Sequence, residues 1–413
     1  MRFLTANLHE FSLIFALKKT FLRRLAKICG FFSGVGPITR FNASEWLAQI
    51  ACEVKDFDPK AYMPAKEARR RDRFEQFATV AAQEALQNSG LEISEENAGR
   101  IGVIVSSAMG GLKSLQDAIF TLKDEGARRV SPFLIPMLMS NGASGLIGID
   151  TGIKGPAMSV ASACASGIDG IGLAWLMLRS GLIDAALTGA SESTLTKTGV
   201  GAFDRLGALS RRNDDYSMTP APFDKNRDGL VMGEGAAVLV METESHAKAR
   251  DAQILAELAG YGATADAYHV TAPSRDGSGG ARAIKMALST AGVNPDEVDY
   301  ISAHGTATQL NDVSETNAVK AAFGQQAYSI PISSTKSMTG HMMGATGALE
   351  TIFCVQAIRE NILPPTIHYQ TPDPECDLDY IPNQAREKKV NIAISNAFGF
   401  GGHNSVLTVK AYK

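Results

Sequence analysis

The alternation of short apolar segments with helix-like segments constrains this chain more than any other feature of its sequence. The segments typical of buried strands include residues 101–105, 184–190, 235–241, 298–303 and 391–395. Helical spacing of apolar residues marks stretches between and around them, at residues 65–86, 283–292, 318–323 and 344–358. Strands that alternate with helices favour a parallel or mixed sheet with helices on its faces. The sequence therefore predicts an α/β fold.

Composition excludes several classes of protein. With 413 residues, 45% of them hydrophobic and 20% charged, the chain can bury a large core or two similar packed units. Its formal net charge of −3 gives no general electrostatic reason to bind nucleic acid. No segment is apolar for long enough to span a bilayer, so we expect no stable membrane insertion. Five cysteines without a CxxC pair suit a reducing compartment, and we expect a cytoplasmic protein.

Cys164 is the first candidate catalytic residue. A β-compatible run over residues 157–162 precedes it, and a helical segment follows. That pattern places the thiol at or beside a helix N-terminus, where unpaired N–H groups favour an anion. We therefore expect a lowered thiol pKa. The competing interpretation is an inert buried cysteine, because free cysteine is among the most buried residue types.

Two histidines follow strand-like segments in glycine-containing loops. His304 lies in the sequence AHGTAT and His341 in STKSMTGHMMGA. A zinc site is a weak alternative, because no His-x₃-His or Cys-x₂-Cys spacing occurs, and we expect no metal. One cysteine with two histidines suits thioester formation followed by carbon–carbon bond formation, with imidazole N–H donors holding an enolate. A cysteine hydrolase would need one histidine and an orienting Asn or Asp.

Four motifs occur in the order that is typical of the β-ketoacyl-acyl-carrier-protein synthases of the Cys-His-His type. They span residues 163–167, 303–308, 334–341 and 396–404. Within that family the chain most resembles the synthase II group of type II fatty-acid synthesis. The resemblance implies a thiolase-like fold, in which two pseudo-repeated halves form a five-layer α-β-α-β-α sandwich. We assign the halves to residues 34–255 and 256–413.

The resemblance also implies an acyltransferase reaction. An acyl primer held on Cys164 as a thioester would condense with malonyl-acyl-carrier protein, with loss of CO₂, to give 3-oxoacyl-acyl-carrier protein. A ketosynthase of a polyketide or other specialised pathway shares every motif and stays open. A non-catalytic chain-length factor would lack Cys164. A degradative thiolase would carry a late cysteine where this chain has FGFGG.

The resemblance assigns roles to individual residues. His304 and His341 would serve decarboxylation and hold the enolate. The N–H groups of Cys164 and Phe400 would form the oxyanion hole, with Phe400 as a gate, because flanking glycines can absorb a dihedral change. The remaining assignments are Lys336 with Asp312, Glu315 and Glu350 for the histidine network, Thr306 and Thr308 for the pantetheine arm, and Met109 and Phe133 for the acyl pocket.

Partners follow from the same resemblance. Lys66, Arg69, Arg70 and Arg205 would dock an acidic acyl-carrier protein, although charged runs are more often simply solvated. The carrier would bring phosphopantetheine as part of the substrate, so we expect no resident cofactor. We also expect a homodimer, with Phe133 reaching the partner's acyl tunnel.

Residues 1–33 depart from the family pattern, which normally opens with a buried strand. Apolar residues at helical spacing, interleaved with basic ones, span residues 11–28. They predict a basic amphipathic helix or an organelle presequence, which would place the protein in a stroma or matrix. A frameshifted or wrongly assigned start is the other interpretation.

Overall fold

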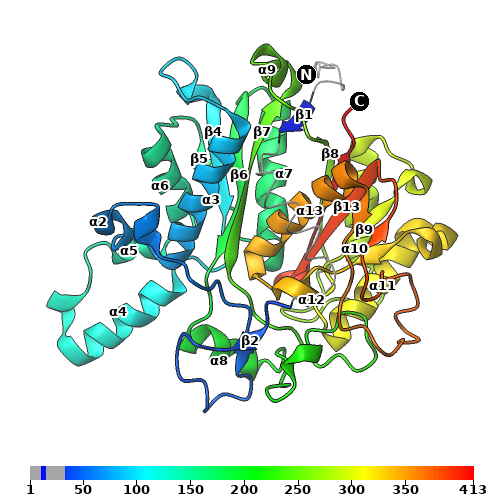
Figure 1. Cartoon of the computed structure of the whole chain (residues 1–413), viewed down its shortest axis with the longest axis horizontal. Helices are drawn as coiled ribbons and strands as arrows, with labels where there is room; N and C mark the ends of the chain where they lie inside the picture. The colour runs from blue at the N-terminus through cyan, green and yellow to red at the C-terminus, as the bar shows by residue number, and fades with distance from the viewer. Residues whose placement is uncertain (1–10, 15–32) are drawn as a thin grey trace.

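Two five-stranded mixed sheets form the frame of the computed structural model, which describes residues 11–14 and 33–413 (Figure 1). The first sheet has the order β1 (Phe11–Ile14), β7 (Gly235–Thr243), β6 (Ala185–Glu192), β4 (Ile101–Ser106) and β5 (Ala157–Met158). The second has the order β8 (Glu257–Ala265), β14 (His403–Lys410), β13 (Ile392–Gly399), β9 (Tyr300–Ser302) and β10 (Ile332–Ser333). In these orders, both sheets have two antiparallel pairings followed by two parallel ones. The second sheet therefore repeats the pairing pattern of the first.

Helices cover both sheets and separate them, which makes five layers (Figure 1). The outer layers are α3 (Arg73–Ser89) with α6 (Gly142–Thr151), and α10 (Ser278–Ala291) with α11 (Gln309–Phe323). Between the sheets lie α7 (Ser166–Arg179) and α13 (Thr346–Glu360), which contact strands of both. The predicted α/β fold and five-layer sandwich are confirmed.

The central layer brings the two halves into contact near Cys164. Helices α7 and α13 are apolar on most sides, and Ile168, Ile171 and Val355 are fully buried. Gly167, in the first turn of α7, has no Cβ, and a Cβ there would lie 2.6 Å from the carbonyl oxygen of Gly344. This close approach holds the N-terminus of α7 against the loop that leads into α13.

One predicted helix is two helices. The sequence predicts a single helix over residues 65–86, but the structure has α2 (Ala65–Ala68), a break, and then α3. The Asp72 carboxylate accepts the N–H of Phe74, and the Glu75 carboxylate accepts the N–H of Asp72 at 2.8 Å. This capping box starts a new helix and turns the chain before it.

The helix predicted over residues 11–28 does not form at its first four residues. Residues Phe11–Ile14 form strand β1, which pairs antiparallel with β7 from Phe11 opposite Thr243 to Ile14 opposite Val240. A strand here pairs the backbone groups that β7 would otherwise leave open at the sheet edge. The rest of the predicted helix, residues 15–28, lies outside the described residues.

Shorter elements connect the layers. They are β2 (Gly36–Pro37), β3 (Ile50–Ala51), α4 (Leu112–Glu125), α5 (Leu134–Leu138), α8 (Lys197–Arg205), α9 (Glu244–Ala249), α12 (Lys336–Thr339), β11 (Ile362–Leu363) and β12 (Arg386–Glu387). Helix α4 buries none of its residues and extends away from the body together with α5 (Figure 1). Among the described residues, no helix is long and apolar enough to cross a membrane.

Candidate active site

Cys164 lies in a short 3₁₀ turn, Ala163–Ala165, which joins the segment after β5 to α7. Ala163 takes the left-handed conformation, with φ of 51°, which is uncommon for a residue with a side chain. Backbone strain of this kind persists only where the surroundings impose it. Here the turn presents the half-buried thiol to a cavity instead of to the core.

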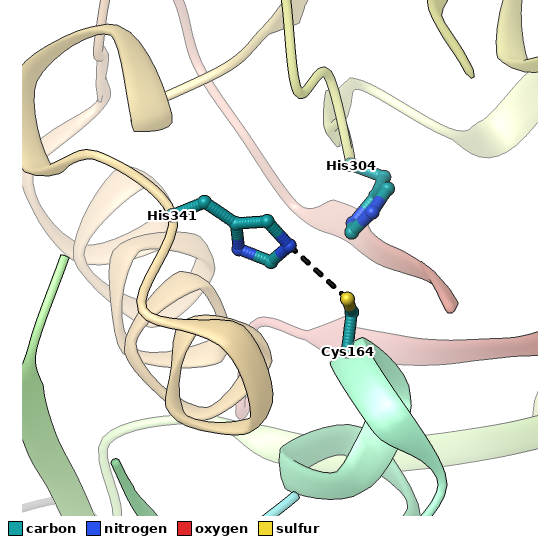
Figure 2. Close-up of side chains that lie close together, drawn as sticks. All are labelled: Cys164, His304 and His341. Atoms are coloured by element: carbon teal, nitrogen blue, oxygen red, sulfur yellow. Dashed lines mark hydrogen bonds between the residues drawn. The ribbon is translucent and has the colours of Figure 1, made fainter. Parts of the chain in front are cut away.

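His341 contacts the thiol directly. Its Nε2 lies 3.2 Å from Cys164 Sγ, and its Nδ1 lies 3.1 Å from the hydroxyl of Thr346 (Figure 2). The ring of His304 stands nearly perpendicular to that of His341, at an angle of 83°, with ring centres 5.3 Å apart. The loops after β5, β9 and β10 thus bring together the three residues selected from the sequence.

The expected low thiol pKa is not found. Burial raises the pKa of Cys164 to about 11, although the ammonium of Lys336 and the N–H groups of Phe400 and Cys164 lower it. The N–H groups at the helix terminus lower the thiol pKa by less than the loss of water around the sulfur raises it. The thiol is therefore protonated at neutral pH, and its proton needs an acceptor.

His341 is placed to be that acceptor. Burial lowers the pKa of His341 and of His304 well below the usual value, and Lys336 lowers both further. Both imidazoles are therefore neutral at pH 7. If Thr346 accepts the Nδ1 proton of His341, Nε2 is free to receive the proton of the thiol.

The same three side chains could also hold a metal ion. Their ligand atoms all lie within 4.8 Å of one another. The direct Cys164–His341 hydrogen bond and the buried Lys336 nearby instead favour thiol chemistry. The absence of a metal remains a prediction.

Lys336 belongs to a buried network behind the histidines. Its Nζ donates to Glu350 Oε1 at 2.7 Å, and both side chains are almost fully buried. Burial raises the pKa of Glu350 to about 7, against the opposing effect of Lys336. Glu315 accepts the backbone N–H groups of His304 and Gly305 at 2.8 and 2.7 Å. This network fixes the loop that carries His304.

Asp312 has a different partner from the one predicted. It accepts the N–H of Thr306 at 3.1 Å, and it pairs with the guanidinium of Arg227, whose Nε lies 3.6 Å away. Arg227 also donates to the carbonyl oxygen of Thr308 at 3.1 Å. No feature of the sequence points to Arg227, because its partners Thr308 and Asp373 lie 81 and 146 residues further along the chain.

A cavity of about 270 Å³ opens onto the thiol. The predicted site residues that line it are Cys164, His304, His341, Thr306, Thr308 and Phe400. The hydroxyls of Thr306 and Thr308 lie 3.0 Å apart on its wall. Gly401 and Gly402, directly after Phe400, have φ of 82° and 72°, which glycine adopts without strain.

The remaining predicted residues lie outside this cavity. Met109 is partly buried and packs, like Phe400, against the apolar cluster that contains Phe203 and Met343. Phe133 is 37% exposed, and its ring lies 4.5 Å from the guanidinium of Arg70. Helix α2, which carries Lys66, lies beside α5, whereas α8, which ends at Arg205, lies at the lower end of the molecule (Figure 1). Docking of a carrier by these four basic residues remains a prediction.

Comparison with protein families identifies the class that this fold and site define. The model of the β-ketoacyl synthase N-terminal domain matches residues 36–247, and that of the C-terminal domain matches residues 255–370. The chain belongs to the β-ketoacyl synthase family, whose members are condensing acyltransferases.

Individual relatives are similar over nearly the whole chain. The chain is 49% identical to 3-oxoacyl-[acyl-carrier-protein] synthase 2 of Synechocystis sp., with 92% of each chain covered. It is 46% identical to the protein of the same name from Staphylococcus aureus, again with 92% of each covered. A solved β-ketoacyl synthase from Burkholderia phymatum is 34% identical, with a TM-score of 0.89 over 98% of both chains. A type II polyketide ketosynthase, solved with its acyl-carrier protein, is 33% identical, with a TM-score of 0.87 over 98% of this chain and 99% of that one.

Proposed function

We propose that this chain catalyses the decarboxylative condensation that elongates fatty acids. The Cys164 thiol displaces the carrier thiol from an acyl primer, and a thioester forms on the enzyme. Malonyl-acyl-carrier protein then loses CO₂, and the resulting enolate attacks the thioester carbonyl. A carbon–carbon bond forms, the bond to Cys164 sulfur breaks, and 3-oxoacyl-acyl-carrier protein leaves.

The position of both neutral histidines at one thiol carries this proposal. His341 Nε2, 3.2 Å from the sulfur, receives the thiol proton as the thioester forms. His341 then passes this proton to the departing carrier sulfur. In the tautomer whose Nδ1 accepts the Thr346 hydroxyl, the neutral His341 ring carries its proton on Nε2, so both rings can direct N–H donors at the enolate oxygen of the malonyl unit. The N–H groups of Cys164 and Phe400 lie against the sulfur, where they can stabilise the charged tetrahedral intermediate.

Relatives favour fatty-acid elongation over a polyketide pathway. Identity is 46–49% to the proteins named synthase 2 and 33% to the polyketide ketosynthase. The test is to incubate the purified chain with an acyl-carrier primer and malonyl-carrier protein and to follow the product over repeated rounds. Saturated primers of increasing length should each give one 3-oxoacyl product. Reaction only with an unreduced poly-β-keto primer would overturn the fatty-acid assignment.

Substrate delivery needs a carrier but no resident cofactor. We assign the phosphopantetheine arm to the cavity wall at Thr306 and Thr308.

A homodimer is supported by exposed apolar residues around α5, including Phe133, Ile135 and Met139. The four described cysteines are free thiols, which supports a reducing compartment such as the cytoplasm.

Carrier docking predicts a salt-sensitive KM. Lys66 and Arg69 are exposed, and Arg70 is half-buried. Changing all three to Glu should raise the KM for carrier-bound substrates and change little for small thioester mimics, because only the carrier presents an acidic surface. A control change at exposed Lys285 of α10 should leave both unchanged. Steady-state kinetics at several salt concentrations measure this, and a salt-independent wild-type KM would place the docking surface elsewhere.

Met109 predicts a limit on primer length. A larger side chain, Met109→Phe or Met109→Trp, should shorten the longest primer that acylates Cys164. Each excluded methylene loses about 0.8 kcal/mol of burial, roughly a fourfold effect on rate. Met109→Ala should widen acceptance or leave it unchanged. The readout is the acylation rate against a series of chain lengths, and an equal loss at every length would show that Met109 only packs the core.

A further inference from the structure

Glu192 is a buried carboxylate that none of the steps above uses. It is the last residue of β6 and is fully buried. One oxygen, Oε1, accepts the Ser107 hydroxyl at 2.9 Å and the Met109 N–H at 3.3 Å. The other, Oε2, accepts the N–H groups of Ala108 at 2.8 Å and Gly344 at 3.2 Å. The carboxylate thus accepts hydrogen bonds from two loops, one from each half of the chain.

These two loops carry two of the predicted site residues, Met109 and His341. We call residues 107–111, after β4, the pocket loop, and residues 341–345, after α12, the histidine loop. A Cβ on Gly344 would lie 2.8 Å from the Ala108 nitrogen and 2.9 Å from Glu192 Oε2, so the loops meet without space between them. The Gly344 carbonyl in turn abuts Gly167 on the helix that follows Cys164. The pocket loop and the histidine loop therefore both bind the Glu192 carboxylate, and the histidine loop in turn packs against the helix that follows Cys164.

The charge of Glu192 has no cationic partner within ion-pair distance in the described part of the chain. Burial raises its pKa to about 7, although the four hydrogen-bond donors lower it. The carboxylate also raises the pKa of the Cys164 thiol, so it lies within electrostatic reach of the sulfur. Burying a carboxylate without a counter-charge is costly, and an apolar contact would hold the loops at lower cost.

We propose that Glu192 is a positioning residue of the condensation reaction, which holds the Met109 backbone of the pocket loop in fixed register with the Cys164–His341 pair. The range of acyl-chain lengths that the enzyme accepts and the geometry of the reacting groups then both depend on the Glu192 side chain. This inference rests on the proposed function.

The variant Glu192→Gln distinguishes the hydrogen bonds of one carboxylate oxygen from those of the other. Its amide keeps the size of the carboxylate but has one acceptor oxygen and one donor nitrogen. The oxygen can serve Ala108 and Gly344, and the nitrogen can face the Ser107 hydroxyl, which is able to accept. The Met109 N–H then loses its acceptor, while the histidine loop keeps its contact.

We therefore expect a selective effect. In Glu192→Gln, acylation of Cys164 by a twelve-carbon carrier thioester should fall about tenfold relative to a four-carbon one, the factor that one hydrogen bond to a charged group provides. Decarboxylation of malonyl-carrier protein should stay within about twofold of wild type, since it depends on the histidines. Alkylation of Cys164 by iodoacetamide at pH 7.5 should be faster, because the carboxylate that raises the thiol pKa is gone.

Glu242→Gln is the matched control. Glu242 is equally buried and pairs with Ala185 at the opposite end of the same β6–β7 ladder, roughly 23 Å from Glu192. Glu242→Gln should leave unchanged both the ratio of twelve-carbon to four-carbon acylation rates and the rate of Cys164 alkylation. If Glu192→Gln does not fold, Ser107→Ala removes one donor and should shift the ratio in the same direction by less.

An unchanged long-to-short ratio in the folded Glu192→Gln variant, or an equal loss at both lengths, would overturn the inference. An unchanged ratio in Ser107→Ala would overturn it where the first variant does not fold. Wild-type condensation is measured in the same assay. Its absence would contradict the proposed function, whereas active wild type with an unchanged ratio contradicts only the role of Glu192.

Discussion

Cys164→Ala should abolish both acyl-enzyme formation and condensation while malonyl-carrier decarboxylation continues. The variant lacks the sulfur that holds the primer, so no carbonyl awaits the enolate. His304 and His341 remain, and enolate stabilisation needs their N–H groups, not the thiol. Measuring CO₂ release and 3-oxoacyl product separately distinguishes the two steps.

Two further variants sharpen this test. Cys164→Gln should raise decarboxylation above that of wild type, because its amide imitates the acylated thiol. Cys376→Ala is the control, since Cys376 is a free buried cysteine that the cavity does not include. It should condense normally. Full condensation by Cys164→Ala would refute the assignment of the nucleophile.

His304→Ala and His341→Ala should each reduce condensation roughly a hundred- to a thousand-fold, the usual effect of removing one oxyanion-type donor. The two variants should differ in the first step. Only His341 lies 3.2 Å from the sulfur, so His341→Ala should also slow acylation of Cys164, while His304→Ala should slow it little. Burst-phase acylation and steady-state product formation measure the two effects.

The matched control for the histidines is His246→Ala, on α9, where His246 contacts Glu242 and not the cavity. It should leave acylation and condensation unchanged. If either His304→Ala or His341→Ala condensed at a near-normal rate, that histidine would have a structural role only.

The reactive residues could be predicted from the sequence because each of them follows a strand-like segment. Cys164 follows β5, and His341 follows β10, which occupies the same place in the second sheet. Strand ends of this kind are marked by local composition, so they can be found without a structure. The thiol pKa could not be predicted in this way, since burial by segments distant in sequence raises it by more than the N–H groups at the helix terminus lower it. Glu192 and Arg227 were missed for a related reason, because each acts through loops far away in sequence.

Element boundaries were predictable where their signal is local. Helix α10 ends before Gly292, and the glycine itself is the signal, because helices commonly end at a glycine that takes the left-handed conformation. The break before α3 carried a readable signal as well, an aspartate followed three residues later by a glutamate, which the helical periodicity of residues 65–86 obscured. Strand β1 has no such signal, because four residues of sequence do not reveal that β7 has an edge to pair.

The most direct test of the central claim follows a single turnover by mass spectrometry. The chain is first mixed with an acyl-carrier primer, and the peptide that contains Cys164 is weighed before and after malonyl-carrier protein is added. We expect an acyl group on Cys164 that disappears on addition, with one CO₂ and one 3-oxoacyl-carrier molecule for each acyl group lost. Release of the acyl group as a free acid, or product formation without any acyl group on Cys164, would contradict the role of Cys164 as the nucleophile that carries the primer.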